Sequence, residues 1–221
     1  MTSRAERPRR YRGITPAERQ AERRERLMEA GLELFGTVGY ARTSVRSVSA
    51  AASLNSRYFY ESFTSREDLL YSVYQRIVTD IFTRAAEAVA RESTLEGQAR
   101  AGLRAGWVAV TEDRRKARIV AIEVVGVSER LERLRREARH ALAQLTADEA
   151  RKLAGGLPLR LNPVIVTRFL MGGVVELLAD WINGDLDAST DEVVDHFTAL
   201  FTASAYASVA EVPPARPRSE R

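Results

Sequence analysis

The sequence contains no cysteine and only two histidines among its 221 residues. Thiols form disulfides, bind structural zinc and iron–sulfur clusters, and serve as nucleophiles, so the lack of cysteine excludes these sites. The two histidines, His140 and His196, have no metal-ligand neighbours at a suitable spacing. We therefore expect no metal site, and we expect both histidines to be surface or packing residues.

A long uninterrupted hydrophobic run is also missing. The longest apolar stretch, residues 164–182, contains Arg168, Glu176 and Asp180, which would be costly at the centre of a bilayer. The first twenty residues are charged and lack the apolar segment, about 7–15 residues long, that a secretory signal peptide needs. The sequence predicts no membrane span and no export signal, so we expect a cytoplasmic protein.

Motifs of common enzyme chemistry are missing as well. The chain has no phosphate-binding loop, no glycine-rich dinucleotide turn, no His-Glu-x-x-His motif and no plausible Ser/His/Asp set. We expect that it is not an enzyme and that it needs no cofactor.

Arginine is abundant, and its distribution is uneven. Residues 1–70 carry the whole formal net charge of +4, because residues 71–221 hold equal numbers of acidic and basic side chains. Residues 1–12 contain five arginines and one glutamate, whereas residues 40–60 contain Arg42, Arg46 and Arg57 and no acid. We assign residues 1–14 to a disordered basic arm, which is either an idle tail or a nucleic-acid contact. The function of the internal basic segment at residues 40–60 indicates which of these two interpretations of the arm to prefer.

Helical periodicity dominates the remaining chain. Apolar residues recur at three- and four-residue spacing and strand signals are nearly absent, so the fold is predicted to be all-α with about nine helices. Capping residues and first-turn prolines mark the starts. The expected helices cover residues 16–37, 44–52, 56–61, 66–90, 95–112, 114–125, 129 to the loop at 155–158, 163–183 and 190 onward. Their expected caps are, in the same order, Thr15, Thr43, Asn55, Ser65, Ser93 or Thr94, Asp113, Ser128, Asn162 and Ser189. Residues 211–221 are rich in proline and arginine and are expected to be disordered.

Residues 43–61 have helix-turn-helix spacing, since two short helices flank a break at Ser53-Leu54-Asn55. Val45, Val48, Ala52 and Phe59 are expected to face the core. The residues that remain outside at the start of the second helix are Asn55, Ser56, Arg57, Tyr58 and Tyr60. Such side chains can enter a major groove and touch base edges or phosphates, although the two tyrosines are divided between packing and DNA contact. Thr43 can cap its helix and touch phosphate as well.

The run from Leu27 to Leu70 resembles the DNA-binding domain of the TetR family of bacterial transcriptional regulators. The resemblance rests on Ala30 and Leu34-Phe35, Gly39-Tyr40, Thr43-Ser44-Val45, Ala52, Phe59-Tyr60 with Phe63, and the run Ser65-Arg66-Glu67-Asp68-Leu69-Leu70. It implies a three-helix helix-turn-helix domain over residues 15–65 and a larger helical domain over residues 66–210 that binds a ligand and dimerises. The predicted DNA-binding residues are Arg42, Thr43, Ser44, Arg46, Asn55, Ser56, Arg57, Tyr58, Tyr60 and Arg66.

Several positions depart from the family pattern. Arg57 stands where members usually carry glycine, and its bidentate fork could read guanine O6 and N7 or hold a phosphate. Arg66 replaces a usual lysine and keeps the charge, while Ser62 replaces a frequent phosphate-contacting histidine.

The resemblance further implies a small-molecule effector of unknown identity and a homodimer formed by the last two helices. Such a dimer would be a repressor that binds a pseudo-palindromic double-stranded DNA operator and leaves it when the effector binds. Those helices are richer in apolar residues than one core-facing side requires, and Gly172-Gly173 suggests a close helix approach. Nominated ligand contacts are Phe82, Trp107, Glu123, Arg168, Phe169 and Met171. Glu123, within an apolar helix, is either solvent-facing or paired inside. One alternative is an all-helical small-molecule-binding protein or enzyme with an incidental helix-turn-helix-like start. Another is a helical protein-interaction module, but the acid-free stretch at residues 40–60 argues against that module.

Overall fold

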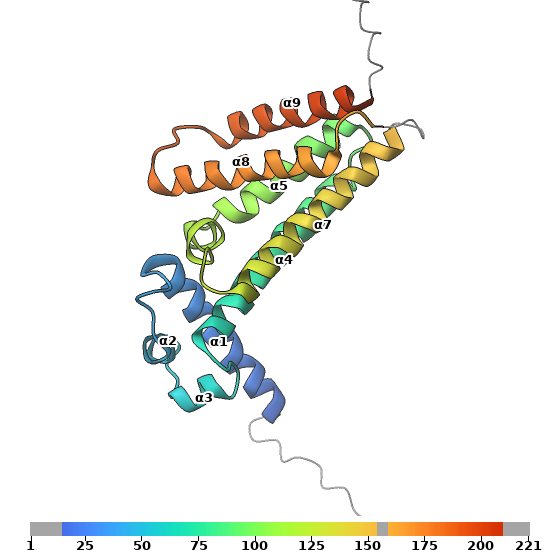
Figure 1. Cartoon of the computed structure of the whole chain (residues 1–221). Helices are drawn as coiled ribbons and strands as arrows, with labels where there is room; N and C mark the ends of the chain where they lie inside the picture. Colours follow the sequence, from blue (N-terminus) through green and yellow to red (C-terminus); the bar gives the residue numbers. More distant parts are fainter. Residues whose placement is uncertain (1–14, 154–158, 210–221) are drawn as a thin grey trace, which may run out of the picture.

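A computed structural model describes residues 15–153 and 159–209, and every regular element in these two ranges is helical (Figure 1). The helices are α1 (Pro16–Thr37), α2 (Val45–Ala51), α3 (Ser56–Tyr60), α4 (Arg66–Val89), α5 (Leu95–Thr111), α6 (Arg114–Arg118), the π-helix η1 (Ile119–Glu123), α7 (Glu129–Leu153), α8 (Pro163–Asn183) and α9 (Thr190–Val209). The all-α prediction is confirmed. The basic arm at residues 1–14, the loop at 155–158 and the tail at 211–221 lie outside the described residues.

Local capping chemistry explains where most helices begin. The Thr15 hydroxyl accepts from the Glu18 backbone N–H, the Glu18 carboxylate accepts from the Thr15 N–H, and Pro16 occupies the first helical position. Asn55, Ser65, Thr94, Asp113 and Asn162 cap α3, α4, α5, α6 and α8 in the same side-chain-to-backbone manner. These starts agree with the sequence predictions because a cap depends only on residues within one turn.

Two local predictions were wrong. Ser44, rather than Thr43, caps α2: its hydroxyl accepts from the Ser47 backbone N–H. The Thr43 side chain turns inward instead, is 2% exposed and donates to the Gly39 carbonyl at 2.8 Å. The single helix expected over residues 114–125 is a short α-helix followed by a π-helical turn, in which the Val124 N–H reaches back five residues to Ile119.

The helices form two regions joined by α4 and α6. In Figure 1, α1–α3 gather at one end, α4 runs away from them beside α7, and α8 and α9 form an antiparallel pair at the far end. The packing that holds the larger region runs from α4 to α5, from α5 to α9 and from α7 to α8. The smaller region therefore projects from one end of a helical bundle.

One apolar core spans the joint between the two regions. Leu27 and Phe35 of α1, Phe59 of α3 and Leu70 of α4 are buried in the same cluster as Ile119 of η1. A second cluster, containing Trp107, Leu178 and Val193, lies farther along the bundle among α5, α8 and α9. Because the first cluster includes η1 and α7 residues, the small region is packed onto the bundle rather than tethered to it.

Candidate nucleic-acid interface

The turn between α2 and α3 is held in a defined shape. Ser53 has a positive φ of 53°, a left-handed conformation that β-branched and bulky side chains adopt only with strain. The Leu54 N–H donates to the Ser49 carbonyl, and the Arg26 guanidinium of α1 donates to the carbonyls of Ala52 and Ser53. The predicted break is thus tied to α1, which fixes the angle between the two short helices.

Helix α3 buries one aromatic ring and exposes its other side. Phe59 is fully buried and packs against Phe63, while Tyr60 is 62% exposed and Tyr58 is 37% exposed. The Arg23 guanidinium lies over the Tyr58 ring, 4.6 Å from its centroid, so Tyr58 is partly engaged by α1. Asn55 caps the helix by accepting from the Arg57 N–H at 2.9 Å. Ser56 is half-buried beside it.

Three arginines of the acid-free segment remain open to solvent. The Arg57 side chain is 85% exposed. Arg46 is exposed on α2 and makes no hydrogen bond or ion pair with any residue that the structure describes. Arg42 is exposed too, and its Nε donates to the Val38 carbonyl at 3.1 Å. These exposed cations lie just before α2, on α2 and on α3, with no acid between them in the sequence. They make this part of the surface positive, which suits phosphate oxygens.

Arg66 lies in a different setting from these three. Its guanidinium donates to the carbonyls of Tyr40 and Thr43 and stacks on the Tyr40 ring, 4.2 Å from the centroid. The guanidinium is therefore engaged within the domain, where it holds the loop between α1 and α2 against α4. Thr43, buried in the same loop, likewise offers no free hydroxyl.

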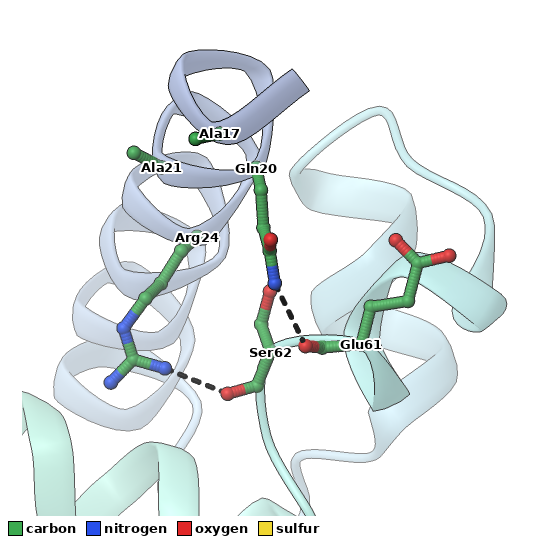
Figure 2. Close-up of a pocket in the computed structure, with 6 residues that line it drawn as sticks. All are labelled: Ala17, Gln20, Ala21, Arg24, Glu61 and Ser62. Atoms are coloured by element: carbon green, nitrogen blue, oxygen red, sulfur yellow. Dashed lines mark hydrogen bonds between the residues drawn. The ribbon is translucent and has the colours of Figure 1, made fainter. Parts of the chain in front are cut away.

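Helix α1 also anchors the far end of α3. Figure 2 shows Gln20 and Arg24 reaching from α1 to the backbone carbonyls of Glu61 and Ser62, at 3.5 Å and 2.7 Å. They line a shallow pocket with Ala17, Ala21 and the residues they hold. The sequence prediction missed Gln20, Arg23, Arg24 and Arg26 as supports of the interface. Their three- and four-residue spacing along α1 identifies a polar face but no partner.

The cations of α6 connect the small region to the bundle. Arg115 bonds to Glu33 of α1 at 2.7 Å. Lys116 contacts Asp80 of α4 and Glu112, the C-cap residue of α5, and Arg114 donates to the Ile182 carbonyl of α8. The hydrogen bond from Arg115 holds the pKa of Asp113 below its usual range. Each cation thus binds a different helix, so α6 fixes where α1 sits on the bundle.

Glu123 is paired inside the protein at this joint. Its carboxylate accepts from the Tyr40 backbone N–H at 2.7 Å and from Arg118 Nε at 2.8 Å, and its side chain is 11% exposed. The carboxylate also lies against Gly39, whose positive φ of 96° favours glycine. The sequence left Glu123 either solvent-facing or paired inside the protein, and in the structure it is paired inside.

The other nominated ligand contacts lie in separate surroundings. Trp107 is buried in the second apolar cluster, and Phe82 is half-buried on α4. Arg168 and Phe169 are exposed on α8, Phe169 by 78%, and Met171 is half-buried. The structure therefore does not gather the six residues into one site.

The described residues offer neither a cluster of metal ligands nor a membrane-spanning helix. Residues 15–153 and 159–209 contain no group of three His, Asp or Glu side chains that could hold a metal ion. No helix within these ranges combines the length and the apolar character needed to cross a bilayer.

Comparisons with known proteins agree with this geometry. Residues 27–73 match the family model described as bacterial regulatory proteins, tetR family. Similar solved structures include the fatty acid degradation regulator FadR from Bacillus halodurans (TM-score 0.71, 16% identity, 81% of this chain and 94% of that one). The transcriptional regulator FadR from Bacillus subtilis in complex with stearoyl-CoA gives a TM-score of 0.71 at 15% identity, over 81% and 98%.

A TetR-like transcriptional regulator from Rhodococcus is similar with a TM-score of 0.68 at 17% identity, over 83% of this chain and 96% of that one. The match in sequence covers α1 from Leu27, the α2-turn-α3 unit and the start of α4, whereas the likeness in structure covers most of the bundle as well. Residues 27–73 therefore carry the sequence pattern of the tetR family of bacterial regulatory proteins, and the chain has the fold of the TetR-like regulators to which it is similar.

Proposed function

We propose that the chain is a homodimeric transcriptional repressor that binds a pseudo-palindromic DNA operator through α2 and α3 and is released by a small-molecule effector. The DNA-reading domain would comprise residues 15–65, and residues 66–210 would sense the effector and pair two copies. The observation that carries the proposal is the positive, acid-free face of α2 and α3, built on a turn that α1 holds in place.

The exposed side chains fall into two roles on DNA. Arg42, Arg46 and Ser44 suit phosphates, because they are exposed just before or on α2, beside the reading helix α3. Arg57, with Asn55, Ser56, Tyr58 and Tyr60 around it, projects from α3 and suits base edges in the major groove. Arg66 and Thr43 support the loop before α2, and they would affect DNA binding indirectly, by holding that loop and α2 in position.

Selection from a random double-stranded library with the purified protein tests this proposal. A homodimer that places two α3 helices in successive major grooves should recover two inverted half-sites, spaced by about one helical turn or a multiple of it. Recovery of no common motif, or of single unpaired half-sites, would contradict the proposed function. A reporter driven by a promoter that contains the selected site then tests the sign of regulation, since a repressor should lower its expression.

Substituting Arg57 with alanine should relax recognition at one base pair per half-site. A guanidinium that donates to guanine O6 and N7 contributes about 1–3 kcal/mol of discrimination, and its loss should leave binding to unrelated DNA nearly unchanged. Titration of labelled operator and of operators changed at each position measures both quantities. Equal weakening on every sequence would assign Arg57 to a phosphate instead.

An apolar surface on α8 and α9 supports the homodimer. Ile165, Phe169, Leu200 and Tyr206 are between 54% and 78% exposed. Gly172 and Gly173 have open space where a side chain would begin, although glycine inside a helix costs roughly 0.5–1 kcal/mol relative to alanine. A partner helix packed against these glycines would account for both features.

Replacing Phe169 with glutamate should therefore convert the dimer to a monomer at micromolar concentration, because the charge would be buried against apolar side chains of the partner. Sedimentation equilibrium measures the change in mass. Arg168→Glu, at the neighbouring exposed position, is the control for added negative charge; it changes the net charge by two units, against one for Phe169→Glu. A variant that remains dimeric would place the interface elsewhere.

The effector of this chain would bind within the bundle formed by α4–α9. One similar structure, FadR from Bacillus subtilis, was solved with stearoyl-CoA, so long-chain acyl-CoA molecules are the first compounds to test. An effector should weaken operator binding, and operator should weaken effector binding by the same factor. Anisotropy titrations with operator alone and with each compound measure that factor.

A further inference from the structure

Glu61 is the first acid after the acid-free segment, and it lies between two arginines. Its Oε1 is 3.4 Å from Arg57 Nε, one helical turn earlier on α3. Its Oε2 is 3.4 Å from Arg23 Nη2 of α1. The Glu61 side chain is 34% exposed, so the carboxylate is partly enclosed by the groups that it binds.

A carboxylate at the end of a DNA-reading helix has an electrostatic cost. It repels phosphates and lowers the affinity for any DNA sequence. Arg57 is in addition a long side chain with many rotamers, and 85% of it is exposed. An unrestrained arginine in this position would bind phosphates and bases with little preference.

We propose that Glu61 is a positioning residue for Arg57, and that it sets the specificity of α3 for guanine. The inference rests on the proposed function, because it requires α3 to read base edges. The ion pair engages Arg57 through Nε, the nitrogen nearest the aliphatic stem, so the terminal nitrogens are free to donate to guanine O6 and N7. Glu61 thereby restricts the direction of the fork without occupying it.

Helix α1 fixes Glu61 in turn. Arg23 binds the second carboxylate oxygen and stacks on Tyr58, and Gln20 donates to the Glu61 carbonyl at 3.5 Å. Arg24 holds the next residue through the Ser62 carbonyl (Figure 2). The direction of Arg57 is thus set from the rigid first helix through Glu61.

The substitution Glu61→Gln separates positioning from simple repulsion. It keeps the side-chain shape and removes the charge that holds both arginines. Affinities are measured for the selected operator, for operator with the guanine pair replaced, and for random-sequence DNA. We expect the ratio of the first two affinities to fall by roughly two- to fivefold, the range of one exposed ion pair. Binding to random DNA should stay equal or strengthen.

Two comparisons make the experiment specific. Glu137 is an exposed acid on α7, far from Glu61 in the sequence. Glu137→Gln removes the same charge and should change none of the three affinities. In the Arg57→Ala background, Glu61→Gln should no longer alter the ratio, because the residue that it positions is gone.

Three results would overturn the inference. An unchanged ratio with stronger binding to all DNA would show that Glu61 only repels phosphates. Equal weakening on all DNA together with a lower melting temperature would make it a structural residue. An unaltered effect of Glu61→Gln in the Arg57→Ala background would remove the link to Arg57. If the wild-type chain itself prefers no sequence, the proposed function fails together with the inference, and that outcome is visible before any variant is made.

Discussion

Gly36→Ala is expected to lower the melting temperature by about 2–12 °C. Gly36 is buried at the last turn of α1, where α6 crosses it. A Cβ at this position would lie 2.7 Å from Arg115 Cα and closer still to its Cβ. Because the obstacle includes backbone, one of the two helices must shift, at a cost of roughly 1–3 kcal/mol that outweighs the helix preference of alanine.

Gly106→Ala is the matched control, since the same change in the middle of α5 meets only Ile81 Cγ2 at 3.6 Å. It should leave the melting temperature unchanged or raise it slightly. Thermal unfolding followed by circular dichroism compares the two variants. Equal stability of Gly36→Ala and the wild-type chain would show that α1 does not need this close approach to α6.

Glu123→Ala is expected to destabilise the joint between the reading domain and the bundle. The substitution leaves the part-buried Tyr40 N–H and the Arg118 guanidinium without their acceptor. A fully buried donor without a partner costs about 1–3 kcal/mol, and Arg118, which is 34% exposed, can turn to water, so we expect a loss near the lower end of that range. Exchange of the Tyr40 amide hydrogen should become faster, because the carboxylate is its acceptor in the folded chain. Thermal unfolding and amide hydrogen exchange measure the two effects.

Glu129→Ala provides the comparison for Glu123→Ala. Glu129 pairs with Arg133 on the surface of α7 and is 80% exposed, so its loss should change stability by less than about 0.5 kcal/mol. Tyr40 exchange that is as slow in Glu123→Ala as in Glu129→Ala would contradict the role assigned to the internal carboxylate.

Features encoded within one or two turns could be predicted from the sequence. The capping pairs at Thr15 and Ser189 and the Asn162-Pro163 start correspond to the observed helix boundaries. Neighbouring hydroxyls were harder to separate: Thr43 and Ser44 can each cap a helix, and the contact of Thr43 with Gly39 depends on how the loop folds over α1.

The joint could not be predicted, because its partners are remote in sequence. The cations of α6 look alike in the sequence, yet Arg115 binds α1 and Lys116 binds α4 and α5. Glu123 reaches Tyr40 because a π-helical turn follows α6, and apolar periodicity does not distinguish that turn from regular helix. Arg66 similarly looked like a free cation, whereas two backbone carbonyls and the Tyr40 ring hold it.

The affinity of an Arg46→Glu/Arg57→Glu double variant for the selected operator tests the central claim most directly. If the positive face of α2 and α3 reads DNA, two charge reversals should weaken binding by at least about a hundredfold. The melting temperature should fall by no more than about 2 °C, because both side chains are exposed and only the exposed pair of Arg57 with Glu61 is lost. Arg133→Glu/Arg136→Glu on α7 changes the net charge equally and should retain most of the affinity. Unchanged binding by the first variant, or equal loss in both, would contradict the assignment of this face as the DNA-binding surface.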